Sequence, residues 1–279
     1  MRQLFYEKMG RIIIALVALG LVLVGWGMDV VEKNHFVWDV STGFRIGALE
    51  TRCLYWWLHG FTIVPILVFS YILRLPYLQH LSVLLKAIFI IAVPFWIWDV
   101  YVTWLGVWGF NSSYTTGLIL NLPLEEWLFF VSIPFACLFI YESLAYYGVR
   151  DWLGGIEKPL TGGLAVLFIL VGFWKWGLSY TSPTFLLAGF FALYHYIYMS
   201  GRYRGRFYLS FLISMIPFVI VDGILTGSGL AHPIVLYNPD EFMGIRLLTI
   251  PLEDMVYCFL MLFSIVSVYE GLKIVKSEP

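Results

Sequence analysis

The chain has 279 residues, of which 61% are hydrophobic and 13% are charged, and its formal net charge is −1. Soluble proteins carry about 25% charged residues, so this composition excludes an ordinary soluble domain and indicates an integral membrane protein. The balanced charge gives no indication of a nucleic-acid partner. Cys53, Cys137 and Cys258 form no C-x-x-C pair and no metal-like cluster with histidines, so we expect neither a disulfide framework nor a metal site.

Apolar runs long enough to cross a bilayer, about 20 residues, recur along the chain. They lie at about 11–28, 54–73, 81–101, 123–147, 160–180, 183–200, 207–227 and 250–272. The first run follows basic residues, as a signal peptide does, but no small-x-small cleavage site follows it, so we expect a retained helix. The pattern predicts an all-α membrane protein of about eight (seven to eight) transmembrane helices.

Lysine and arginine in the loops predict the orientation of these helices. With a cytoplasmic N-terminus, the inner side holds Arg2, Lys8, Arg11, Arg74, Arg150, Lys158, Arg202, Arg204, Arg206, Lys273 and Lys276. The outer side then holds only Lys33, Arg45, Arg52, Lys175 and Arg246. We therefore expect a multi-pass protein of the cell membrane with both termini cytoplasmic.

A phrase with two adjacent acids begins two of the apolar runs. It reads Pro123-Leu124-Glu125-Glu126 in one run and Pro251-Leu252-Glu253-Asp254 in the other, so the numbering of the two copies differs by 253 − 125 = 128. Tyr141-Glu142 recurs as Tyr269-Glu270 at the same offset, 270 − 142 = 128. Such self-similarity indicates an internal repeat.

The repeat predicts an organisation in four parts: an N-terminal helix and loop at 1–53, a first repeat at 54–150, a connecting helix within 151–182 and a second repeat at 183–279. Four predicted helices separate equivalent positions, so the repeats insert in the same direction, in parallel topology, about an axis along the membrane normal. Both acidic phrases then begin at the outer face and can line one central cavity.

Carboxylates in a membrane segment cost about 2.5–3.5 kcal/mol and indicate function by default. Acids in a first helical turn also complement the helix dipole, but that explains one acid per helix, not two. A capping box is excluded because Thr249 precedes Glu253 by four positions instead of three. We therefore predict that Glu125, Glu126, Glu253 and Asp254 are catalytic.

Adjacent carboxyl groups at a low-dielectric boundary do not both ionise easily, so one of each pair is expected to stay protonated. The protonated group can donate a proton and its ionised neighbour can accept one. Aromatic faces nearby can stabilise a cation. The set suits acid-initiated isomerisation of an apolar, unsaturated molecule from the bilayer.

Asp99 and Asp222 each follow a proline by five positions, one loop before the paired acids. They are expected either to orient those acids or to lie at the membrane interface. Glu142 and Glu270, near the opposite helix ends, are interpreted as solvated. The Trp- and Gly-rich loop at 102–122 is a candidate to fold back into the bilayer.

The sequence gives little support for a haem, retinal, diphosphate or dinucleotide site. The numbers of His59 and His195 differ by 195 − 59 = 136, which breaks the offset of 128 and favours packing or gating over haem ligation. Lys273 lies at a helix end, whereas a retinal Schiff base needs a lysine in mid-helix. The chain contains no paired Asp-rich diphosphate motif, Gly-rich phosphate loop or dinucleotide fingerprint.

Several segments resemble the membrane-type lycopene cyclases. Trp98–Val100, Leu105–Asn111 and Leu122–Phe130 are similar to the first half of that family, and Gly223–Gly227, Tyr237-Asn238, Gly244–Asp254 and Tyr269-Glu270 to the second. The resemblance covers roughly residues 54–274, in the order of the single-chain fused form. The predicted helix at 11–28 departs from the shorter family pattern.

The resemblance implies a cofactor-independent isomerase of carotenoid biosynthesis, a lycopene β-cyclase that converts linear ψ ends to β-ionone rings and gives γ- and then β-carotene. The family motifs correspond to Glu125-Glu126 and Glu253-Asp254. Expected supporting residues are Asp99, Asp222, Asn111 and Asn238, and expected substrate-lining residues are Trp98, Trp108, Trp127, Phe130 and Tyr257. Expected partners are lycopene and other apolar carotenoids, membrane lipid and other carotenoid enzymes.

Two alternatives stay open at this point. A cyclase of another polyene, such as a C50 carotenoid, keeps the reaction class and is distinguished by pigment mass. A proton-coupled transporter of small solutes would use the acids as proton relays and would show uptake driven by a pH gradient. The identity of the donor carboxyl, the ring type and the oligomeric state are not predicted.

Overall fold

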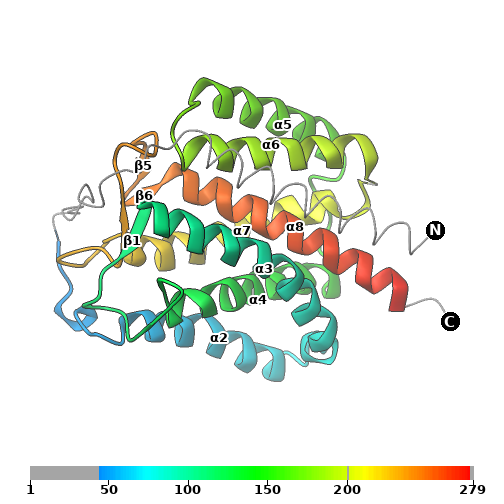
Figure 1. Cartoon of the computed structure of the whole chain (residues 1–279). Helices are drawn as coiled ribbons and strands as arrows, with labels where there is room; N and C mark the ends of the chain where they lie inside the picture. The colour runs from blue at the N-terminus through cyan, green and yellow to red at the C-terminus, as the bar shows by residue number, and fades with distance from the viewer. Residues whose placement is uncertain (1–43, 200, 277–279) are drawn as a thin grey trace.

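A computed structural model describes residues 44–199 and 201–276, which form a bundle of long helices (Figure 1). The helices are α2 (Leu54–Ile72), α3 (Leu81–Leu105), α4 (Leu124–Tyr146), α5 (Glu157–Trp174), α6 (Thr181–Tyr198), α7 (Arg204–Leu225) and α8 (Leu252–Lys276). Within the described residues, six helices are long and apolar enough to span a membrane, and α6 is not among them. The predicted all-α membrane protein is confirmed; the apolar run at 11–28 lies outside the described residues.

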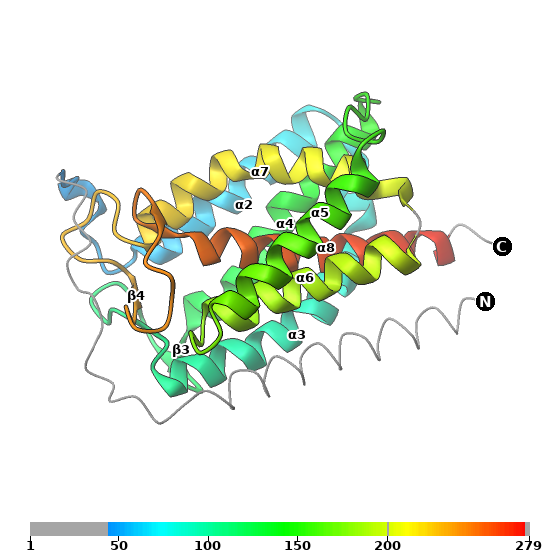
Figure 2. The same ribbon diagram turned by 90° about the horizontal axis from the view of Figure 1, so that it is seen from above.

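Helix α8 lies at the centre of the bundle. Of its most apolar window, 78% is buried, against 44% or less in the other spans. It packs against α3 and α6, while α4 packs against α2, α3 and α7, and α5 covers α6 (Figure 2). Helices α2, α4, α6 and α8 begin at the end of the bundle that carries the short strands, and α3 and α7 end there (Figure 1). We call this the strand end.

A β-hairpin leads directly into each acidic helix. Strands β2 (Leu118–Ile119) and β3 (Leu122–Pro123) precede α4, and β5 (Arg246–Leu247) and β6 (Ile250–Pro251) precede α8. The first residues of the two hairpins differ by 246 − 118 = 128 in number, which is the offset of the acidic phrases. The turn of the first places Leu120 and Asn121 at φ of 48° and 64°, as two-residue turns with a matching twist require. Each hairpin thereby sets where its acidic helix begins.

A third pair of strands joins the two halves of the chain. Strand β1 (Trp108–Phe110) pairs antiparallel with β4 (Val235–Tyr237), with Trp108 opposite Tyr237. The two strands occupy nearly equivalent positions in the repeats, because Leu236 follows Trp108 at the offset of 236 − 108 = 128. Antiparallel pairing of equivalent segments is what a two-fold axis along the bundle would produce, in agreement with parallel orientation of the acidic helices. We call this pair of strands the roof.

Glu50, just before α2, connects the N-terminal side of the described chain to the loops of both halves. Its carboxylate accepts hydrogen bonds from the Tyr114 hydroxyl, from the Ala231 amide at 2.7 Å and from Arg45 Nε at 2.9 Å. The Tyr114 hydrogen bond is the main cause that holds the pKa of Glu50 below its ordinary value of 4.5, and the Ala231 and Arg45 contacts act in the same direction. Glu50 therefore stabilises the fold in its ionised form.

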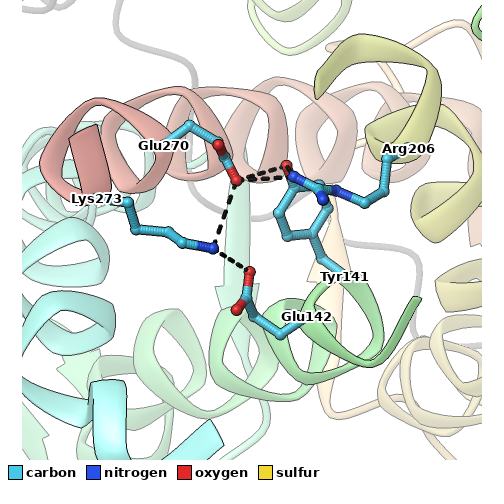
Figure 3. Close-up of polar contacts among 5 residues, drawn as sticks. All are labelled: Tyr141, Glu142, Arg206, Glu270 and Lys273. Carbon is cyan, nitrogen blue, oxygen red and sulfur yellow. Dashed lines mark hydrogen bonds and ion pairs between the residues drawn. The ribbon is translucent and has the colours of Figure 1, made fainter. Parts of the chain in front are cut away.

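A charged cluster joins α4, α7 and α8 at the opposite end of the bundle (Figure 3). Arg206 donates to Glu270 at 2.9 Å and to the Tyr141 hydroxyl at 2.5 Å, and Lys273 donates to Glu142 at 3.0 Å. The Glu142 and Glu270 side chains are only 14% and 17% exposed. Their interpretation as solvated helix ends was wrong, because tertiary packing brings a cation to each.

Replacing Glu50 by Gln should lower the thermal midpoint of the detergent-solubilised protein by a few degrees, since a neutral amide accepts weaker hydrogen bonds. The pKa of Glu50 is lower in the folded than in the unfolded chain, so its contribution is present above about pH 4.5 and is lost as the pH falls through the folded pKa. The difference in midpoint between variant and wild type should be largest near neutral pH. A difference in midpoint that does not diminish as the pH is lowered below about 4.5 would contradict this assignment.

Replacing Arg206 by Met should lower the free energy of unfolding by about 1–3 kcal/mol, because the part-buried Glu270 carboxylate loses its closest cation. Lys86→Met, at an exposed position of α3, is the matched control and should have little effect. Denaturant unfolding in detergent measures both. Equal destabilisation by the two substitutions would argue against the cluster.

Candidate active site

A cavity of about 70 Å³ lies under the roof at the strand end of the bundle. Four carboxyl groups line it: Asp99 near the end of α3, Glu126 at the start of α4, Asp222 near the end of α7 and Asp254 at the start of α8. All four side chains are buried. No lysine or arginine is among the described residues that line the cavity, so the four acids face an otherwise largely aromatic and aliphatic wall.

The second acid of each adjacent pair faces this cavity and is bound by phenols. The Tyr55 hydroxyl donates to Glu126 at 2.6 Å. Asp254 accepts hydrogen bonds from two phenols, the Tyr180 hydroxyl and the Tyr237 hydroxyl, the latter at 2.8 Å. Hydrogen bonds to a carboxylate favour its ionised form, so the two repeats present chemically different carboxyls to the same space.

The first acid of each pair points elsewhere, because adjacent residues of an α-helix project about 100° apart. Glu125 accepts hydrogen bonds from the Thr116 amide at 2.9 Å and from the Thr116 hydroxyl at 2.8 Å. Glu253 accepts them from the Thr181 hydroxyl at 2.5 Å and from the Met243 amide at 2.9 Å. Glu125 and Glu253 are fully buried and do not belong to the described cavity wall. Glu125 thus connects α4 to the loop before it, and Glu253 connects α8 both to the loop before it and to the start of α6.

Asp99 and Asp222 lie in the cavity and not at a solvated boundary. One Asp99 oxygen accepts a hydrogen bond from the Trp108 indole at 2.6 Å. Within the described structure, the other Asp99 oxygen and Oδ2 of Asp222 have no hydrogen-bond partner. Asp222 also lies close enough to Asp254 for the two carboxyls to interact. The structure therefore brings Asp99 and Asp222 into the same cavity as Glu126 and Asp254.

Aromatic side chains surround the acids, with Tyr257 at their centre. Trp108, Phe130 and Tyr257 line the cavity. Trp98 is packed behind them, with its ring centroid 5.3 Å from that of Tyr257. Trp127 lies elsewhere: it packs on Trp96 at 5.3 Å and its indole donates to the Ile119 carbonyl at 3.2 Å. Of the five expected lining residues, three therefore line the cavity. Trp98 supports them from behind, and Trp127 contacts the first hairpin instead.

Asn111 and Asn238 connect the two halves beside the roof. The Asn111 amide donates to the Pro233 carbonyl at 3.2 Å, and the Asn238 amide donates to the Gly106 carbonyl at 3.4 Å. Each asparagine therefore reaches from one repeat to the loop of the other. Their described hydrogen bonds support the roof and do not reach the acids directly.

The phenols that bind the acids were missed by sequence reasoning. The numbers of Tyr55 and Tyr180 differ by 180 − 55 = 125, so the two do not follow the offset of 128. The chain contains 18 tyrosines, and no local pattern marks these two. Tyr237 was included only as part of a family motif.

The histidines do not belong to the described cavity wall. His59 contacts the Ser132 hydroxyl at 2.8 Å and the Glu125 carbonyl at 2.9 Å, and His195 contacts the Ser267 hydroxyl at 2.9 Å. Each thus joins its helix to one of the two acidic helices. Within the described residues, no group of three or more His, Cys, Asp and Glu side chains is placed to hold a metal ion.

Comparison with family models gives a match over two segments of the chain. A family model described as Lycopene cyclase matches residues 52–144 and 177–272. Neither a curated protein nor a solved structure matches the chain. The two matched segments comprise more than half of the chain and include all four carboxyls of the cavity. The chain therefore belongs to the lycopene cyclase family.

Proposed function

We propose that the chain is a lycopene β-cyclase, which converts the linear ψ ends of lycopene to β-ionone rings by protonation, cyclisation and deprotonation. Family membership makes it a carotenoid cyclase of the membrane. The observation that carries the more specific proposal is the cavity in which Glu126 and Asp254, one from each repeat, meet among aromatic rings. A site of this kind can donate a proton and take one back without a change of oxidation state.

Glu126 is the proposed proton donor. It is buried, it accepts one phenol hydrogen bond among the described contacts where Asp254 accepts two, and three other carboxyls share its cavity. Mutual repulsion among carboxylates in a low-dielectric space favours a protonated form for at least one of them. Transfer of that proton to the terminal double bond of the ψ end breaks one π bond and leaves a tertiary carbocation.

The ring closes when the next double bond attacks this cation, and the positive charge moves onto the new ring. Trp108, Phe130 and Tyr257 line the cavity, and their rings are the proposed groups that stabilise this charge. Their bulk also limits the room for water, which would otherwise quench the cation.

Asp254 is the proposed base that removes the ring proton. Its two phenol donors favour the ionised form, and its place in the first turn of α8 adds the helix dipole. Asp99 and Asp222, each with a carboxyl oxygen that has no partner among the described residues, are the proposed route by which the proton returns to Glu126. The cycle then balances: one proton is given and one regained, and no electron carrier is consumed.

Glu125 and Glu253 are proposed as positioning residues, which hold the hairpin loops against α4 and α8. We also keep the proposal, from loop charges, that both termini are cytoplasmic, which places the strand end at the outer face. The two repeats at 54–150 and 183–279, with α5 in the connection, are likewise proposed.

Expression of the chain in lycopene-producing cells tests the reaction directly. Lycopene should be replaced by γ-carotene and β-carotene, because each cyclised end adds one β-ionone ring without changing the mass. Chromatographic retention separates these isomers of equal mass, and mass detection identifies any product of a longer polyene. Unchanged lycopene in cells that contain folded protein would refute the proposal, and rings formed only on a longer polyene would redirect it.

Glu126→Gln and Asp254→Asn should each lower the rate of ring formation by about 100-fold or more, since general acid–base groups contribute roughly 10²–10⁴. Glu125→Gln is the matched control, because it removes the adjacent carboxyl group while its amide oxygen can still accept from Thr116. We expect Glu125→Gln and Glu253→Gln to retain more activity, within about tenfold of wild type. Full activity in Glu126→Gln, or a loss in Glu125→Gln as severe as in Glu126→Gln, would overturn the assignment.

A further inference from the structure

A second cavity, of about 210 Å³, adjoins the acid cavity and lies between α2, α4 and α7. Its wall is almost wholly apolar. Phe129, Ile133, Phe218 and Asp222 line both cavities, so the two spaces share one partition. From there the second cavity follows α4 as far as Ile140. At about 1.5 Å per residue, the stretch of helix from 129 to 140 is roughly 17 Å long.

This second cavity is open on the side that faces lipid. Helices α2 and α7 each pack against α4 but scarcely against each other. Phe61 on the α2 wall is 57% exposed, and Pro217 on the α7 wall is exposed as well. Pro65 and Pro217 both line the space, and a proline inside a helix removes a backbone hydrogen bond and favours a bend. We call the space the α2–α7 groove.

We propose that the α2–α7 groove receives the polyene laterally from the bilayer and holds its linear chain while the reacting end lies among the four carboxyls. This inference rests on the proposed function. Three observations carry it: the groove adjoins the acid cavity through shared lining residues, its wall offers apolar contact, and its open side is one that only a hydrophobic molecule would use. The occupant is the unreacted part of an unsaturated hydrocarbon chain.

The floor of the groove identifies the residues that decide whether a chain fits. Ala136 and Cys137 are small side chains on α4, both partly exposed in the groove. Ala136 follows Glu126 on the same helix, roughly 15 Å along its axis at about 1.5 Å per residue. A larger side chain there would obstruct the substrate chain without touching the acids.

The test fills the groove and leaves the acids intact. Ala136→Phe and Cys137→Phe are compared with Val93→Phe, which adds bulk on the exposed side of α3, in the full chain expressed in lycopene-making cells. Ring formation per amount of folded protein should fall by about tenfold or more in the groove variants and stay near wild type in the control. Where Ala136→Phe fails to fold, the series Ala136→Val and Ala136→Leu should show a graded loss.

A binding measurement separates the groove from the reaction. In the Glu126→Gln background, lycopene retained by the purified protein is measured by absorbance, with and without Ala136→Phe. Retention should be lost with Ala136→Phe and kept with Val93→Phe. Equal retention in both, or an active wild type whose groove variants are equally active, would overturn the groove proposal while leaving the cyclase intact. A wild type that retains lycopene through the groove but forms no ring would overturn only the proposed reaction.

Discussion

The main physical constraint on this structure is the burial of four carboxyl groups in an apolar bundle. No lysine or arginine is among the described residues of their cavity wall. Such burial is costly unless hydrogen bonds or shared protons offset it. Phenols, an indole and the first turns of α4 and α8 supply much of that compensation. Within the described structure, one oxygen each of Asp99 and Asp222 has no hydrogen-bond partner, so the compensation inside the cavity is incomplete.

Several contacts around the cavity hold these groups in place. The hairpins set the start of α4 and α8, and Glu125 and Glu253 fasten the loops to those helices. The roof joins the halves above the acids, and the charged cluster joins α4, α7 and α8 at the far end. Because the halves contact each other at both ends, the site is built by both repeats together, with each supplying two of its four acids.

The two repeats surround their acids differently. Among the described contacts, Glu126 has one phenol partner and Asp254 has two, so equivalent positions of a duplicated sequence differ in their hydrogen-bond partners. The groove adds a second asymmetry, because it opens beside α2 and α7 and shares its partition with the acid cavity. A substrate that arrives from that side meets Phe129 and Phe218 before the acids.

The sequence by itself determined the membrane class, the seven described helices, the equivalence of the two acidic phrases and the family, because hydropathy and a constant offset of 128 are properties of the linear chain. Only the tertiary structure decided which acid of each pair faces the cavity. Neighbours on a helix project about 100° apart, and the packing of other helices selects between them. The tertiary structure also decided which side chains bind these acids. Tyr55 and Tyr180 come from distant segments with no periodic signal, whereas Trp127, close to the acids in sequence, packs on Trp96.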